Sequence, residues 1–180
     1  MKPVLPHPLR LADLPQRKPT RFRLVPDEGQ LEALSDRLGV DAMRKVRMEG
    51  TLGPGSGRDW TLEATLGATV VQPCRVTTDP VTTRIDEAVA RRYAADYAEP
   101  SGEEVEMDAD DGIEPLPAVL DLGHLLEEVI ALAIPAYPRA EGVEDIDLVA
   151  TPPGAEPIDD EAVKPFAGLA DLRKRMDGDT

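Results

Sequence analysis

The chain has 180 residues and a formal net charge of −15, which is spread unevenly along it. Residues up to Arg58 contain 11 Lys and Arg against 7 Asp and Glu, whereas those from Asp59 onward contain 9 against 28. A chain this acidic is repelled by nucleic-acid phosphates, which excludes non-specific nucleic-acid binding by all but the basic N-terminal third. The acidic remainder suits a basic protein partner.

The composition also limits the class of protein. The length suffices for one domain with a core, which must be aliphatic because the chain has one Trp, three Tyr and two Phe. No apolar run approaches the roughly 18–20 residues of a membrane-spanning helix, and the proline-broken N-terminus does not resemble a signal peptide. Cys74 is the only cysteine, which excludes an internal disulfide and a cysteine zinc cluster. We therefore expect a cytoplasmic protein that contacts no membrane.

The N-terminal part predicts an arm, a strand and a helix. Residues 1–20 are rich in proline and predict an extended or mobile arm ahead of a single domain at residues 21–176. Phe22–Val25 is a short strand candidate. A helix should begin at Pro26–Glu28, where acids favour the helix N-terminus, and stop at Gly39.

Three strands should follow. Apolar and polar residues alternate in Arg44–Leu52 and in Trp60–Val70, and a glycine-rich turn joins the two runs, which is typical of an antiparallel hairpin. Alternation resumes after Cys74 and continues from Val81. The segment Asp86–Tyr97 is compatible with a strand or a helix, and we favour a strand to about Arg92.

The acidic half contains two loops and two helices. Residues 96–114 hold nine acids and no Lys or Arg, which predicts a mobile acidic loop or a docking tail for a basic partner, and residues 140–159 are similar. Asp121 should cap a helix that ends before Pro135, with Glu127 on its polar side. A last amphipathic helix is expected at Pro165–Met176.

Together these elements predict an α+β fold. We expect an antiparallel β-sheet of about four strands, which Gly67 and Pro73 could curve toward a partial barrel, with two to three packed helices and mobile acidic loops.

No set of residues typical of catalysis stands out. His7 falls in the arm and His124 on the polar side of a helix, and the glycine-rich turn lacks the Lys-Ser/Thr pair of a phosphate loop. Cys74 has no basic or His neighbour in sequence to lower its pKa, so we interpret it as a buried structural thiol. We expect no catalytic residues, no metal or other cofactor and no small-molecule substrate.

Three blocks of the sequence resemble the bacterial YceD family, the large ribosomal RNA subunit accumulation proteins. The first is VVQPCRVTTDPV at Val70–Val81, with Cys74 and Pro80. The second is DLGHLLEEVIALAIPAYPR at Asp121–Arg139. The third is KPFAGLADLRK at Lys164–Lys174. The block residues that we single out as structural or binding residues are Cys74, Pro80, Asp121, Glu127, Pro135, Pro138, Pro165 and Phe166.

The chain departs from the family pattern at two positions. Many members carry a second cysteine where this chain has Thr77, and often an Asn where it has Lys164. The first departure argues against a paired-cysteine metal or redox role.

The resemblance implies a non-enzymatic factor that supports synthesis, processing or stability of large-subunit (23S) ribosomal RNA. Its implied partner is a precursor of that RNA, a pre-ribosomal particle or a basic large-subunit ribosomal protein. The residues that would face RNA lie in the basic third: Arg21, Arg23, Arg44, Lys45 and Arg47. The alternative is an acidic protein-interaction adaptor unrelated to ribosomes.

Overall fold

The computed structural model describes residues 2–97 and 113–143. Met1–Gly142 form one compact unit, built on an open five-stranded sheet. In spatial order its strands are β2 (Thr20–Leu24), β3 (Ala42–Pro54), β4 (Trp60–Pro73), β5 (Pro80–Ala94) and β6 (Ile113–Pro115). All neighbours pair antiparallel except β5 and β6, which are parallel.

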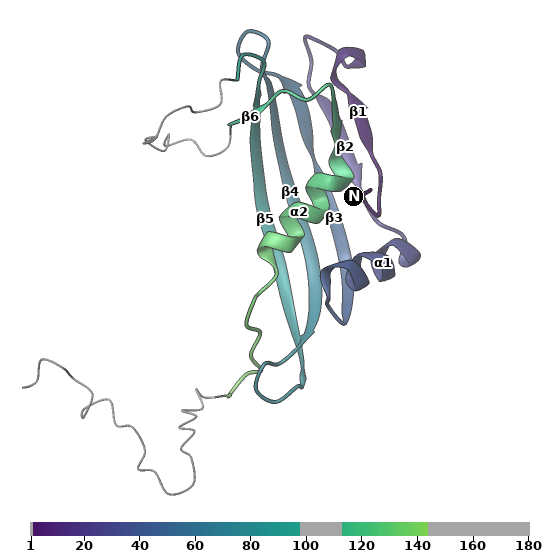
Figure 1. The fold of residues 1–180 in the computed structure, drawn as a ribbon, viewed down its shortest axis with the longest axis vertical. Coiled ribbons are helices and arrows are strands. Elements are labelled where there is room, and N and C mark those ends of the chain that lie inside the picture. Colours follow the sequence, from purple (N-terminus) through teal and green to yellow (C-terminus); the bar gives the residue numbers. More distant parts are fainter. Residues whose placement is uncertain (1, 98–112, 144–180) are drawn as a thin grey trace, which may run out of the picture. The chain divides into compact units, whose positions relative to one another are not determined.

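Two helices accompany the sheet, α1 (Glu28–Leu38) and α2 (Leu122–Ala133). Figure 1 shows α2 running obliquely across one face of the long strands, with α1 beside β3. We call the face under α2 the inner face and the opposite one the outer face. Among the described residues, no helix is long and apolar enough to cross a membrane.

The α+β class is confirmed, but two details of the sheet were wrong. It has five strands rather than about four, because Ile113–Pro115 at the end of the expected acidic loop adds β6 beside β5. It is not closed into a barrel, since its order ends at β2 and β6.

The long strands follow the predicted alternation. Leu62, Leu66 and Val70 of β4 are buried on the inner face, while the threonines between them are more exposed. The choice of a strand for the segment after Asp86 is confirmed, because β5 pairs with β4 along its whole length. The buried residues Ile85, Val89 and Tyr93 recur every four residues, a spacing that fits both a helix and a strand. Only the pairing with β4 therefore decides that this segment is a strand.

Capping residues set the helix ends as expected. The Asp27 carboxylate accepts from the Gln30 N–H while the Gln30 side chain accepts from the Asp27 N–H, which closes a capping box on α1. Gly39 ends that helix in the left-handed conformation, at φ 66°. Asp121 caps α2.

The N-terminal segment is extended, as the prolines suggest, but it belongs to the compact unit rather than preceding it. β1 (Pro8–Arg10) pairs antiparallel with β7 (Val119–Asp121), and a short 3-10 helix, Leu11–Asp13, follows it. Leu11 is buried in the core, and Leu5 and Leu9 pack against it. These leucines between the prolines supply the apolar area that holds the segment in place.

The apolar side chains that α2 buries should contribute a large part of the free energy of unfolding. Leu126 is fully buried, whereas Leu132 on the same helix is 76% exposed. We expect Leu126→Ala to lower the free energy of unfolding by about 2–5 kcal/mol and Leu132→Ala to change it by no more than about 0.5 kcal/mol. Urea unfolding of the two variants measures this difference, and equal losses would contradict the placement of α2.

Candidate functional site

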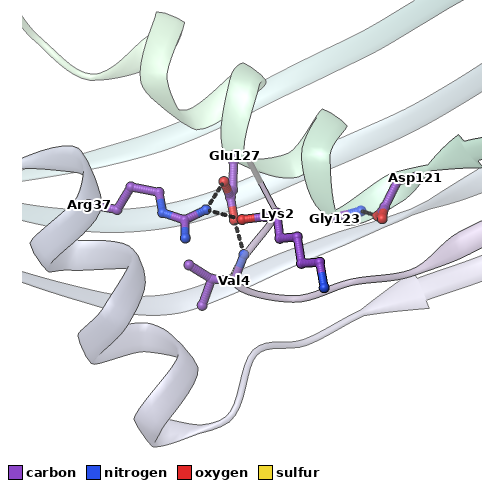
Figure 2. Close-up of polar contacts among 6 residues, drawn as sticks. All are labelled: Lys2, Val4, Arg37, Asp121, Gly123 and Glu127. Carbon is purple, nitrogen blue, oxygen red and sulfur yellow. Dashed lines mark hydrogen bonds and ion pairs between the residues drawn. The ribbon is translucent and has the colours of Figure 1, made fainter.

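Glu127 lies at the centre of a polar cluster that joins three segments of the chain (Figure 2). Its side chain, on α2, is 11% exposed and forms a 2.8 Å ion pair with Arg37 of α1. The same carboxylate accepts from the Val4 N–H, and the Arg37 guanidinium also donates to the Lys2 carbonyl at 2.8 Å. We call Lys2, Val4, Arg37 and Glu127 the N-terminal clasp.

Asp121 extends this attachment toward the start of α2. Its carboxylate accepts from the Gly123 N–H and from the His7 N–H, each at 2.9 Å, and the Leu122 N–H donates to the His7 carbonyl at 3.0 Å. A Cβ at Gly123 would collide with the Leu5 carbonyl, so the close passage of the N-terminal segment over this helix requires a glycine.

The expected position of Glu127 was wrong. Helical periodicity placed it on a polar, solvent-facing side with His124 and Glu128. Those two residues are exposed, but Glu127 as a whole residue is only 9% exposed because the N-terminal segment covers it. Glu128 points elsewhere and pairs with Arg91 of β5 at 3.1 Å. In the sequence, only the leucines of the N-terminal segment indicate that this segment packs on the core. The pair between Arg37 and Glu127 has no local signal, because the two residues are ninety positions apart.

Cys74 occupies a second cluster, in the loop between β4 and β5. The residue is 2% exposed, and its sulphur accepts from the backbone N–H groups of Val76, Thr77 and Ala140, each at 3.4 Å. The Thr77 side chain and these N–H groups lower the pKa of the Cys74 thiol to about 6, while burial acts in the opposite direction. The sequence argument missed this shift because the Thr77 side chain and backbone donors, rather than a basic side chain, produce it.

The segment that leaves α2 is tied to the same loop. The Arg75 N–H donates to the Pro138 carbonyl at 2.9 Å, and the Gln72 side chain donates to the Pro135 carbonyl at 3.2 Å. Pro80 begins β5 opposite Pro73. Four of the block residues, namely Cys74, Pro80, Pro135 and Pro138, therefore lie along one connection between the β4–β5 turn and the exit of α2.

Thr77 replaces the second cysteine within this loop. Its N–H and side chain both contribute to holding the Cys74 sulphur as an acceptor. In the described part of the chain, no group of three or more His, Cys, Asp and Glu side chains is placed to hold a metal ion. The arrangement binds a polypeptide segment, Pro138–Ala140, to a turn.

The basic residues expected to face RNA lie on or beside the outer face. Arg21 and Arg23 come from β2, and Arg44, Lys45 and Arg47 from β3. The structure groups only three of them. Arg23, Lys45 and Arg47 line a groove of about 410 Å³ together with Arg84 of β5. Arg21 and Arg44 do not line this groove. Arg84 was not anticipated, although alternation along β5 puts it on this face.

Two of the singled-out residues cannot be placed. Pro165 and Phe166, with the last predicted helix, lie outside the described residues, as do most of the two acidic stretches.

The comparisons with known proteins agree with the three blocks. The model of a family described as "Large ribosomal RNA subunit accumulation protein YceD" matches residues 62–173, which is well over half of the 180-residue chain. No curated protein and no solved structure matches the chain significantly.

The N-terminal clasp generates a prediction about attachment of the first residues. Glu127→Ala leaves the Arg37 charge and the Val4 N–H without their acceptor, so we expect a loss of about 1–3 kcal/mol in unfolding free energy and faster amide exchange at Val4 and His7. Glu32→Ala, on the exposed side of α1, is the matched control. Unchanged exchange in Glu127→Ala would show that the clasp does not hold this segment.

Cys74 generates a prediction about pH. The folded pKa of about 6 lies below the value of about 8.5 for a free thiol, so the folded state favours the thiolate. Stability should therefore rise between about pH 6 and pH 8.5 and lose this contribution below about pH 6. Unfolding at several pH values, with Cys74→Ser as the variant that lacks the rise, measures it. A thiolate absorbance midpoint above pH 8 in the folded protein would contradict it.

Proposed function

Because the chain belongs to the YceD family, we propose that it is a non-enzymatic factor in the accumulation of large-subunit ribosomal RNA. It supports synthesis, processing or stability of 23S ribosomal RNA in the bacterial cytoplasm. It does so by binding a pre-ribosomal particle, the RNA precursor or a basic ribosomal protein. The family match is the observation that carries this proposal.

The local chemistry of the block residues supports a non-enzymatic role. Glu127 is occupied by Arg37 and the Val4 N–H, and Asp121 by the His7 and Gly123 N–H groups. Cys74 is buried, with 2% of the residue exposed, and its sulphur accepts from backbone N–H groups. A nucleophile or general base must reach a substrate atom, whereas these groups are committed to the chain itself.

An acidic adaptor unrelated to ribosomes is the second candidate, and the net charge of −15 favours it. The two candidates differ in what accompanies the protein in cells. A ribosomal factor brings large-subunit RNA or a large-subunit ribosomal protein, and an adaptor brings neither.

Crosslinking of the tagged protein in growing cells tests the proposal. We expect large-subunit precursor RNA or a large-subunit ribosomal protein to be enriched several-fold over a tagged unrelated acidic protein of similar size. We also expect deletion of the gene to lower 23S relative to 16S ribosomal RNA, and Cys74→Ser to restore it. Enrichment of other proteins alone, with normal 23S levels in the deletion strain, would contradict the ribosomal proposal.

A further inference from the structure

The outer face carries a concentrated positive charge on an otherwise acidic protein. One groove is lined by four cationic side chains together with Val25 and Thr69, and we call it the basic groove. The four cations are Arg23, Lys45, Arg47 and Arg84. The Arg23, Arg47 and Arg84 side chains are 66%, 54% and 43% exposed, so their guanidinium groups can reach a ligand.

An irregularity in β3 builds this groove. Between Arg44 and Arg47 the pairing with β4 shifts by one residue: Arg44 lies opposite Thr69, and Arg47 lies opposite Gly67. The extra residue, Lys45, has a positive φ of 51°, which is unfavourable for a lysine. A bulge of this kind redirects side chains and breaks the alternation, so that Arg44 and Arg47 come to the same outer face. Strain at a non-glycine residue among clustered cations points to a binding role.

The local acids neutralise the groove only in part. Glu49 is shared between Arg23 at 3.7 Å and Arg47 at 3.9 Å, which are both long contacts. Asp86 pairs with Arg84, and this contact lowers the pKa of Asp86. Lys45 makes no ion pair with another residue of the described chain. Four cations therefore face two carboxylates, and the excess of positive charge is exposed to solvent.

We propose that the basic groove binds the backbone phosphates of double-helical RNA. The inference deepens the proposed function, on which its choice of RNA rests. Arginine forks match phosphate oxygens in pairs, and the Thr69 hydroxyl beside Arg84 adds a donor. The negative charge over the rest of the chain repels RNA and so confines it to this groove.

The placement of aromatic residues argues for a duplex rather than a single strand. Single-stranded RNA is held mainly by stacking of its bases on aromatic side chains, and duplex RNA by contacts to phosphates and 2′-hydroxyls. Phe22, Trp60 and Tyr93 are buried in the core, and the exposed Tyr97 and Tyr137 lie outside the lining of the groove. No aromatic side chain lines the basic groove. Binding should therefore read backbone shape and charge, with little dependence on base sequence.

Two triple variants test the proposal on the full chain. Lys45→Gln/Arg47→Gln/Arg84→Gln removes three charges from the groove. Arg17→Gln/Lys18→Gln/Arg58→Gln removes three charges from exposed positions outside it and serves as the matched control. Affinity for an RNA duplex of about 16 base pairs, and for one of its strands alone, is measured against salt concentration.

We expect the wild type to bind the duplex more tightly than the single strand, with log affinity falling steeply with log salt. The groove variant should lose about tenfold or more in affinity at low salt, and its salt slope should become shallower by about 2–3, one unit for each lost phosphate contact. The control should lose no more than about threefold, by general charge alone.

Several results would overturn the proposal. These are equal losses in the two triple variants, wild-type binding that does not depend on salt, or a single strand bound as tightly as the duplex. If the groove variant unfolds, Arg23→Gln/Lys45→Gln replaces it, because this variant leaves the Arg84 contacts with Asp86 and Thr69 intact. The 23S level in a deletion strain tests the proposed function separately, so failure of the groove and failure of that function are distinguishable.

Discussion

The contact of α2 with the inner face of the sheet is the interaction on which the rest of this structure depends. Leu122, Leu126 and Ile130 are fully buried in it, and each contributes roughly 1.5–3 kcal/mol by leaving water. A helix of 12 residues cannot cover strands of up to 15, so other segments must complete the layer. The N-terminal segment covers one side of α2, and the residues that leave the helix extend the cover to the β4–β5 turn. Once the N-terminal segment lies across α2, the Glu127 carboxylate is removed from water and needs the Arg37 guanidinium as its partner.

This construction leaves the two faces of the sheet with different roles. The inner face and everything packed on it form the core, where the polar groups of the family blocks are occupied by backbone donors and, at Glu127, also by the Arg37 guanidinium. The outer face keeps its alternating polar residues exposed, and the bulge at Lys45 collects cations there. Because antiparallel sheets are stable with one face covered, no stability argument requires a partner on the outer face. A surface that folding does not need is free to be used for binding.

Sequence patterns predicted the parts of this fold that local physics determines. The start of α1 near Pro26–Glu28, the cap at Asp121, the stop at Gly39 and the strand pairs around the glycine-rich turn all follow from nearby residues, although Asp27 itself was not predicted as a cap. The patterns failed where a distant segment decides. Glu127 is polar by periodicity and buried by the N-terminal segment, and the pKa of Cys74 is set partly by the N–H of Ala140, which is 66 residues away. The groove itself was not predicted: Arg23, Lys45 and Arg47 were named among residues that would face RNA, but the register shift that brings them beside Arg84 has no clear signal in the sequence.

The residues that identify the family and those that would touch RNA are different residues. The family match begins at residue 62, after β2 and β3. Three of the four cations of the basic groove, Arg23, Lys45 and Arg47, therefore lie outside the match. Within the match, Asp121 and Glu127 hold the N-terminal segment against α2, and Cys74 holds the segment that leaves this helix. Family membership connects the chain with large-subunit ribosomal RNA accumulation, and it does not by itself assign the open face. The cation-lined groove on that face rests on the charge and the strained bulge of this chain, and the choice of RNA as its ligand rests on the proposed function.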